Sequence, residues 1–267
     1  MSPYRAKKRF GQHFLTSKSV ISRMIELIAP GPELTVLEIG PGRGVLTLPL
    51  TQSGAKIVAV EFDRDLIGHV KRAVIGYENV KVINADFVSF DPDSEGLTKF
   101  ALVGNLPYNI TTPVIDWCVR YRDRIQYAVF MVQREMAARL AATPGHKDWS
   151  PLGIFTQLFF DIERCFDVSA RSFSPPPKVV SAVIRLTPRA SDLQVDWSSF
   201  ESLVRASFRH RRKLLINNLV PDIVPSDEFA IALLGSIGIP KNCRAEQVTI
   251  EQFDQLAIAI ADERKSW

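Results

Sequence analysis

The stretch TVLEIGPGRG, residues 35–44, decides the fold of this chain. It begins with a short, β-branched apolar run that is typical of a buried strand, and it continues into Gly40, Gly42 and Gly44 ahead of a helical pattern. Glycines in such a turn let the backbone approach a ligand where a helix amino terminus faces it. A glycine-rich turn is also simply a tight connection, so the motif alone leaves ligand binding open.

Four more runs of the same kind follow, each separated from the next by a segment with helical spacing. They are KIVAVE (56–61), VKVINA (80–85), FALVGN (100–105) and QYAVFMV (126–132). Their apolarity is continuous rather than alternating, which indicates strands covered on both faces, as in a parallel sheet with crossover helices. The segment SFSPPPKVVSAVIRLTP (172–188) predicts a proline-stiffened turn and one more strand. The sequence therefore predicts a doubly wound α/β fold.

The last part of the chain has a different pattern. From Trp197 onward the apolar residues have helical spacing, interrupted by Pro and Gly, and no strand pattern remains. A length of 267 residues allows roughly 1.8 domains at ~150 residues each. We therefore expect two domains, an α/β domain over 1–188 that includes a basic amino-terminal segment, and a small all-helical domain over 189–267.

Composition excludes several classes of protein. Apolar residues make up 46% of the chain and charged residues 23%, which is typical of a globular protein and not of a disordered one. No apolar run approaches the ~18–20 residues of a membrane span, and the first residues lack the apolar core of a signal peptide. Cys118, Cys165 and Cys243 lie far apart, which argues against a disulfide framework and a thiolate zinc site. We expect a cytoplasmic monomer that binds neither a metal nor a membrane.

Positive charge is concentrated in two segments. The stretches 1–23 and 205–213 contain eleven of the 33 Lys and Arg residues and no acidic residue, whereas acids outnumber bases in the rest of the chain. Such clusters are typical of a nucleic-acid-binding surface, although a solvated helix face has the same composition. The candidate phosphate-binding residues are Arg5, Lys7, Lys8, Arg9, Arg205, Arg209, Arg211, Arg212 and Lys213.

Polar residues stand at the ends of the next predicted strands. Glu61 closes the second strand, Asp86 follows the third, and Asn105 ends the fourth. Ligands of open α/β sheets bind at the carboxyl ends of the strands, so we expect these residues and Gly40 to line one crevice. The carboxylate of Glu61 could accept hydrogen bonds from the hydroxyls of a ribose, and that of Asp86 could accept one from the exocyclic amine of an adenine. Asp86 and Asp63 also fit helix caps, and the spacing alone does not distinguish a dinucleotide from S-adenosylmethionine.

The segment NLPYNI, which begins at Asn105, carries the most specific signal. The exocyclic nitrogen of adenine is a poor nucleophile because its lone pair is delocalised into the ring, so modifying it requires acceptors for the amine protons. The side-chain oxygen of Asn105 and the carbonyl of Leu106, next to the rigid Pro107, supply two acceptors. Tyr108 supplies a ring on which the base can stack, and Phe173 is a candidate for the opposite wall. The alternatives are a turn with a buried tyrosine and a core position for Phe173.

Together these motifs resemble a known family. The segments KKRFGQHFL (7–15), EIGPGRG (38–44), NLPYNITTP (105–113), FSPPPKVVSAV (173–183) and FRHRRKLLINNL (208–219) are similar, in the same order, to the small-subunit ribosomal RNA adenine dimethyltransferases. The likeness covers nearly the whole chain and is strongest to the bacterial kasugamycin-resistance type. It implies a Rossmann-like class I methyltransferase sheet with a small helical domain, and S-adenosylmethionine as methyl donor. It further implies transfer of four methyl groups to two adjacent adenosines in a hairpin loop near the 3′ end of small-subunit rRNA, with the pre-small ribosomal subunit as partner.

The resemblance also assigns roles to residues. The cofactor positions of the family fall on His13, Leu15, Gly40, Glu61, Asp86 and Asn105, and its base-handling positions fall on Asn105, Leu106, Pro107, Tyr108 and Phe173. His13 stands where asparagine is common, which bears on how the amino-terminal segment closes over the cofactor. His210 and Leu214 also depart from the family pattern, which bears on RNA contacts.

Other functions share part of this signature. A large-subunit rRNA adenine methyltransferase of the macrolide-resistance type has the same catalytic motif, but KKRFGQHFL and FRHRRKLL favour the small-subunit enzyme. A DNA adenine methyltransferase usually has a separate target-recognition insertion, for which this chain has little room. A non-catalytic ribosome-assembly or transcription factor would bind nucleic acid without turnover, and the intact NLPY, Glu61 and Asp86 argue against it. The chemistry needs neither a metal nor a covalent nucleophile, because positioning and acceptors supply the rate enhancement.

Overall fold

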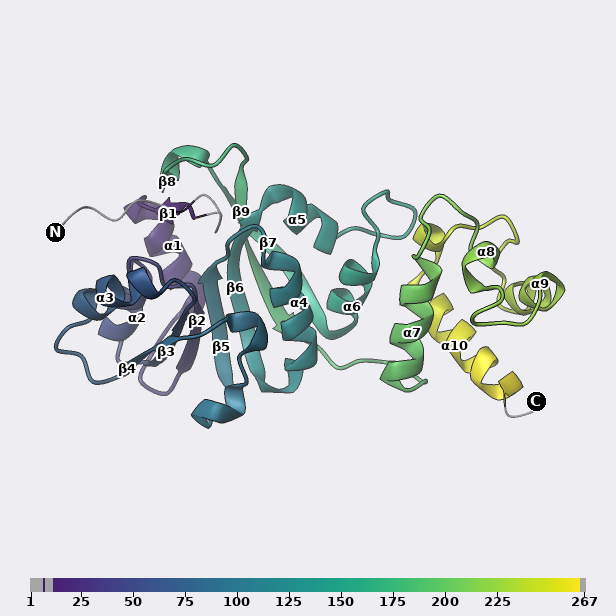
Figure 1. Cartoon of the computed structure of the whole chain (residues 1–267), viewed down its shortest axis with the longest axis horizontal. Helices are drawn as coiled ribbons and strands as arrows, with labels where there is room; N and C mark the ends of the chain where they lie inside the picture. Colours follow the sequence, from purple (N-terminus) through teal and green to yellow (C-terminus); the bar gives the residue numbers. More distant parts are fainter. Residues whose placement is uncertain (1–6, 8–11, 265–267) are drawn as a thin grey trace. The chain divides into compact units, whose positions relative to one another are not determined.

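Figure 1 shows the computed structural model of the chain, which describes residue 7 and residues 12–264. The chain forms two compact units. The first comprises Met1–Ala137 and Phe160–Pro188, and the second comprises Ala138–Phe159 and Arg189–Trp267. The expected domains, 1–188 and 189–267, have the same break after Pro188 but differ from these units over 138–159.

The first unit contains a seven-stranded sheet with the order β4-β3-β2-β5-β6-β9-β7. Its strands are β2 (Thr35–Ile39), β3 (Lys56–Glu61), β4 (Val80–Asn84), β5 (Phe100–Asn105), β6 (Ile125–Gln133), β7 (Phe160–Val168) and β9 (Ser181–Pro188). Neighbours from β4 to β6 are parallel, whereas β9 pairs antiparallel with both β6 and β7. The order reverses between β2 and β5, and the crevice at such a switch point is where open α/β sheets bind ligands.

The central strands are buried along their whole length. In β2, Val36, Leu37 and Ile39 are at most 1% exposed, and the first five residues of β5 are buried as well. This continuous burial is why their sequences show uninterrupted apolar runs. The helices of this unit are α1 (Lys18–Ile28), α2 (Thr47–Gln52), α3 (Arg64–Ala73), α4 (Thr111–Arg120) and most of α5 (Arg134–Leu140). The predicted α/β class is confirmed.

Two features of the first unit were not predicted from the sequence. Strand β7 lies at an edge of the sheet and has exposed charged residues, among them Asp161, Glu163 and Arg164, so it lacks an apolar run. The second feature is a two-stranded sheet in which β1 (Phe14–Leu15) pairs antiparallel with β8 (Phe173–Ser174). Strands of two residues are too short to show a pattern.

The second unit is helical. Its helices are α6 (Pro151–Phe159), α7 (Trp197–Ser207), α8 (Ile216–Leu219), α9 (Asp227–Ser236) and α10 (Ile250–Arg264), and residues 189–264 contain no strand. Segment 138–159 belongs here because its aromatic residues pack on this unit. The Phe155 and Phe159 rings each lie 5.1 Å from the Trp197 ring, and the indole of the buried Trp149 donates a hydrogen bond to the Val248 carbonyl at 2.9 Å. In the described part of the chain, no helix has the length and apolarity needed to cross a membrane.

We expect Gly44→Ala to destabilise the protein more than Gly76→Ala. Both glycines have a left-handed φ, +79° and +86°, which strains any residue with a Cβ. An added Cβ at Gly44 would lie only 2.9 Å from the Ala73 Cβ, whereas nothing lies within 4 Å at Gly76. We expect a loss of about 1 kcal/mol for Gly76→Ala and at least about 2 kcal/mol for Gly44→Ala, measured by urea unfolding. Equal losses would show that the contact with Ala73 relaxes without cost.

Candidate active site

A cavity of about 370 Å³ lies at the carboxyl ends of the central strands of the first unit. Its walls include residues 12–15, the glycine turn after β2, the end of β3, and the NLPYNI segment after β5. The structure brings Gly40, Glu61, Asp86 and Asn105 together in this wall. His13, Leu15, Leu106, Pro107 and Tyr108 also line the cavity.

The carboxylate of Glu61 joins two parts of the cavity wall. One oxygen accepts a hydrogen bond from the backbone N–H of Gly42 at 3.0 Å, and the other accepts one from the backbone N–H of Asp63 at 2.8 Å. Burial raises the pKa of Glu61, and these two backbone donors oppose the rise. A carboxylate has about four acceptor sites, so Glu61 keeps acceptor capacity for a ligand.

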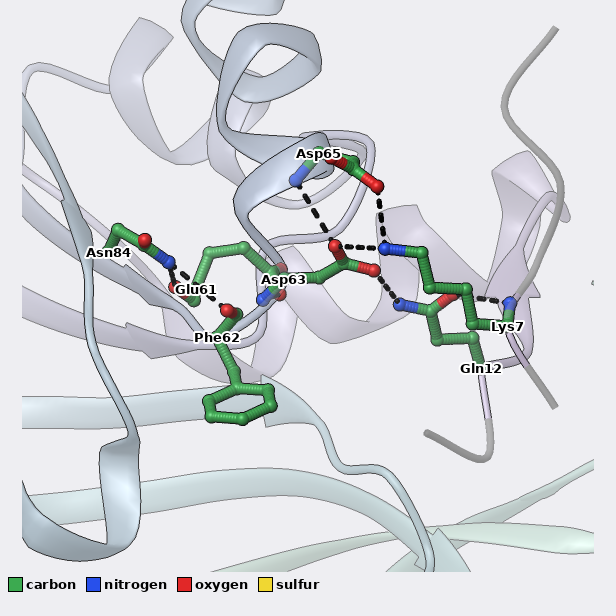
Figure 2. A network of polar contacts seen from close by, with 7 residues as sticks. All are labelled: Lys7, Gln12, Glu61, Phe62, Asp63, Asp65 and Asn84. Carbon is green, nitrogen blue, oxygen red and sulfur yellow. Dashed lines mark hydrogen bonds and ion pairs between the residues drawn. The ribbon is translucent and has the colours of Figure 1, made fainter. Parts of the chain in front are cut away.

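Asp63 contacts two residues from the start of the chain, Lys7 and Gln12, as Figure 2 shows. Its carboxylate caps α3 by accepting from the Asp65 N–H at 3.1 Å, and it also accepts from Gln12 Nε2 at 3.0 Å. The ammonium of Lys7 donates to Asp63 Oδ1 and to Asp65 Oδ2, both at 2.7 Å. Lys7 and Gln12 are therefore both tied to the start of α3. This gives Lys7 an intramolecular partner, and its predicted contact with RNA phosphate stays a prediction.

Asp86 follows β4 and serves as a cap. Its Oδ1 accepts a hydrogen bond from the backbone N–H of Val88 at 3.0 Å, and the residue is exposed at the cavity. The capping role considered for Asp86 from the sequence is therefore present alongside its place in the cavity wall. Its second carboxylate oxygen extends the set of acceptors there.

Glu38 and Phe62 line the cavity although the sequence analysis did not select them. Glu38 lies within β2 and is 1% exposed, and its Oε2 accepts no hydrogen bond from the described residues. Burial raises the pKa of the Glu38 carboxyl to about 8. A buried polar atom without a partner is costly, so this oxygen fits a ligand that forms a hydrogen bond with it. Glu38 could have been selected from the sequence because it is an acidic residue inside an otherwise apolar strand. Phe62 could have been selected because it directly follows Glu61, the acid at the end of a strand.

The base-handling motif presents two acceptors. The side-chain nitrogen of Asn105 donates to the backbone carbonyl of His13 at 3.0 Å, which fixes the amide. Among the described residues, none donates a hydrogen bond to the side-chain oxygen of Asn105 or to the carbonyl of Leu106. Both oxygens are thus available to a ligand, as the sequence required for an adenine amine.

Tyr108 is held from two directions. Its hydroxyl lies 2.9 Å from Ser181 Oγ, and its ring is stacked with the His13 imidazole at a centroid distance of 5.7 Å. Burial raises the pKa of Tyr108, and the hydrogen bond to Ser181 partly opposes the rise. The hydroxyl therefore stays protonated at neutral pH.

Phe173 is not among the residues that line the cavity. It is 4% exposed and packs in the hydrophobic core with Leu15, its cross-strand partner in the β1–β8 pair. Its assignment as a wall of the base pocket stays a prediction.

The basic residues fall in both units. Arg5, Lys8 and Arg9 lie outside the described residues. In the second unit Arg205 pairs with Glu201, Arg209 pairs with Asp222, and Arg211 donates to the Lys147 carbonyl. The remaining members of the second segment, Arg212 and Lys213, are exposed.

Arg205 and Arg211 also line a surface cavity of about 290 Å³ in the second unit together with Arg139, which the sequence analysis did not select. RNA binding by these residues stays a prediction. In the part of the chain that the structure describes, no group of three or more His, Cys, Asp or Glu side chains is arranged to hold a metal ion.

Comparison with known proteins decides the family. The family model described as ribosomal RNA adenine dimethylase matches residues 4–262. The chain belongs to the ribosomal RNA adenine dimethylase family. It is 39% identical to the ribosomal RNA small subunit methyltransferase A of Bordetella pertussis, covering 97% of this chain and 96% of that one. It is 40% identical to the protein of the same name in Pseudomonas fluorescens, covering 98% and 96%.

Solved structures agree with this assignment. A dimethyladenosine transferase from Plasmodium falciparum superposes with a TM-score of 0.80 at 25% identity, covering 94% of this chain and 98% of that one. The 23S rRNA methyltransferase ErmE gives a TM-score of 0.70 at 30% identity, covering 93% and 99%. The expected class I methyltransferase fold is confirmed, and S-adenosylmethionine is the cofactor of this dimethylase family.

We expect Lys7→Met to weaken cofactor binding. The substitution removes a charge-assisted contact to Asp63, which is 4% exposed, and with it one of the ties that hold residues 12–15 against the cavity. Loss of about 1 kcal/mol corresponds to roughly a fivefold rise in Kd. Calorimetry with S-adenosylhomocysteine in the absence of RNA measures it.

Lys81→Met is the matched control, because Lys81 pairs with Glu95 away from the cavity lining and its loss should leave this Kd unchanged. If Lys7→Met keeps the wild-type Kd for S-adenosylhomocysteine and weakens only RNA binding, Lys7 is an RNA ligand, as the sequence alone suggested.

Proposed function

We propose that this protein dimethylates the N6 amines of two adjacent adenosines in the 3′-terminal hairpin loop of small-subunit (16S) rRNA during small-subunit biogenesis. The observation that carries the proposal is the pair of unpartnered acceptors, Asn105 Oδ1 and the Leu106 carbonyl, in the wall of one cavity with Gly40, Glu61 and Asp86. The small-subunit substrate is supported by the names of relatives that are 39–40% identical over nearly the whole chain.

The residues present fit S-adenosylmethionine. When bound, it supplies an electrophilic methyl group. Glu61 would hold the ribose hydroxyls, Asp86 would accept from the adenine amine, and the turn at Gly40 would let the backbone approach the ligand. The unpartnered Oε2 of Glu38 would form a hydrogen bond with the polar end of the ligand, which removes the cost of leaving this oxygen buried without a partner. His13 and Leu15 close the amino-terminal side of the site.

The target base would be activated by position and by hydrogen bonds. Asn105 Oδ1 and the Leu106 carbonyl would accept hydrogen bonds from the amine N–H groups and so favour a nitrogen lone pair that is not delocalised into the ring, while Tyr108 would stack on the base. Both acceptors become better partners as positive charge develops on the nitrogen, so they favour the transition state over the ground state. The methylated amine is acidic and loses its proton to solvent, so the reaction needs no dedicated base. Phe173 and Pro107 complete the proposed base-handling set.

The basic residues would bind the RNA backbone. Arg205, Arg209, Arg211, Arg212 and Lys213 would contact phosphates from the helical unit, and the basic residues from Arg5 to Arg9 would do so from the amino-terminal segment. Adenines in a hairpin loop suit the site because unstacked bases cost little to extract. We propose that the protein acts as a monomer in the cytoplasm on the pre-small ribosomal subunit.

We expect Asn105→Ala to lower kcat at least roughly a hundredfold, because the variant loses an acceptor that matters most in the transition state. Transfer of labelled methyl to rRNA measures kcat, and calorimetry with S-adenosylhomocysteine checks that the cofactor still binds measurably. Retained turnover would contradict the role given to the side-chain oxygen.

The substrate is tested by offering labelled S-adenosylmethionine with small subunits that lack the modification, with large-subunit rRNA and with duplex DNA. Dimethyladenosine found only in small-subunit rRNA is the expected result. Label in large-subunit rRNA would support the macrolide-resistance type, and label in DNA would support a DNA enzyme. Tight binding to subunits without transfer would support a non-catalytic assembly factor.

A further inference from the structure

We propose that Ser181 and His13 are positioning residues that hold the Tyr108 ring in place, so that the target adenine stacks on the face of Tyr108 away from His13. The motifs above give Ser181 no role, and the resemblance assigns His13 to the cofactor. The inference rests on the proposed function, because it concerns how the base is held during methyl transfer.

The first line of support is the burial of Ser181. Its side chain is 0% exposed, and the Tyr108 hydroxyl, 2.9 Å away, is the one hydrogen-bond partner of its Oγ among the described residues. A buried hydroxyl is costly unless it is bonded, so the serine is best explained by the tyrosine that it contacts. Tyr108 is only partly buried, and without Ser181 its hydroxyl could turn to water instead.

The second line of support is the place of Ser181 in the sheet. It is the first residue of β9, and it pairs with Gln133 at the end of β6 and with Val168 at the end of β7. The backbone of Ser181 is therefore fixed from both sides. Its hydrogen bond ties a side chain from the loop after β5 to a rigid element that is 73 residues away in the chain.

The third line of support is the way His13 is held. Its Nδ1 lies 2.8 Å from the Pro175 carbonyl, and because a carbonyl only accepts, Nδ1 carries the proton. The next two residues, Phe14 and Leu15, form the strand that pairs with β8. The imidazole is thus fixed against the Tyr108 ring, with a centroid distance of 5.7 Å and an interplanar angle of 29°.

The same residue also orients the other base-handling group. The backbone carbonyl of His13 accepts from the side-chain nitrogen of Asn105 at 3.0 Å, which leaves the side-chain oxygen as the end that an amine can reach. His13 therefore sets both the ring and the acceptor that meet the base. Groups held in this way lose little freedom when the base arrives, and this raises kcat more than affinity for the cofactor.

The hydroxyl pair is tested by a double-mutant cycle. Ser181→Ala and Tyr108→Phe each remove one partner of the same hydrogen bond, so we expect each to lower kcat by the same factor, roughly tenfold, and the double variant to lower it no further. The Kd for S-adenosylhomocysteine should stay at the wild-type value. Ser207→Ala is the matched control, because Ser207 is another fully buried serine whose hydroxyl donates to a backbone carbonyl within α7. It should cost stability without changing kcat.

The ring contact is tested with two substitutions at His13. His13→Phe keeps a ring against Tyr108, and His13→Leu removes it, so we expect His13→Phe to retain most of the kcat that His13→Leu loses. An increase in RNA affinity for His13→Leu would overturn the inference, because it would mean that the imidazole occupies the place of the base and must be displaced.

A measurement without substrate keeps the inference separate from the proposed function. In protein labelled with fluorotyrosine, the Tyr108 fluorine resonance is assigned by its absence in Tyr108→Phe. We expect it to shift and narrow in Ser181→Ala as the ring gains freedom. An unchanged resonance, or a wild-type kcat in Ser181→Ala, overturns the positioning role. Absence of transfer by the wild-type protein to any RNA would instead overturn the proposed function.

Discussion

The carboxyl group of Glu61 is buried and therefore needs hydrogen-bond donors from the protein. The architecture of the site depends on which groups supply them. The two oxygens of Glu61 bond to the backbone of Gly42 and Asp63, so the glycine turn after β2 and the loop after β3 have a fixed separation. Asp63 in turn receives Lys7 and Gln12 and begins α3. Glu61 and Asp63 thereby link the glycine turn, the start of α3 and the residues Lys7 and Gln12 around a single cavity. Without Glu61 these loops would share no common anchor.

Much of the fold could be predicted because strands that are buried on both faces have continuous runs of apolar residues. The predicted runs at 56–61 and 100–105 coincide with β3 and β5, and the run at 35–40 exceeds β2 by one residue. The same logic fails for β7, because an edge strand with one exposed side has no need of an apolar run. It also fails for 138–159, whose place in the helical unit depends on contacts such as that of Trp149 with Val248, which local sequence does not encode.

The site was predictable to the extent that strand ends determine it. Residues Gly40, Glu61, Asp86 and Asn105 meet because the topology brings the carboxyl ends of parallel strands to one edge. The sequence could not show which residues contact each other when they lie far apart in the chain. The sequence alone could not show that the ammonium of Lys7 contacts Asp63 and Asp65, or that Phe173 pairs with Leu15 and packs in the core. Glu38 was overlooked because an acid in a buried strand resembles an irregularity in an apolar run.

The antiparallel direction of β9 affects which strands of the sheet carry the groups for each ligand. A parallel strand has only its last residues at this edge of the sheet, but β9 is antiparallel to β6, so its first residue, Ser181, lies opposite the last residue of β6. The half of the sheet from β2 to β4 thus carries the groups suited to a nucleoside ligand, while the half from β5 to β9 carries those suited to an incoming base. The two halves meet at the β2–β5 boundary, and Asn105, at the end of β5, is proposed to serve both ligands.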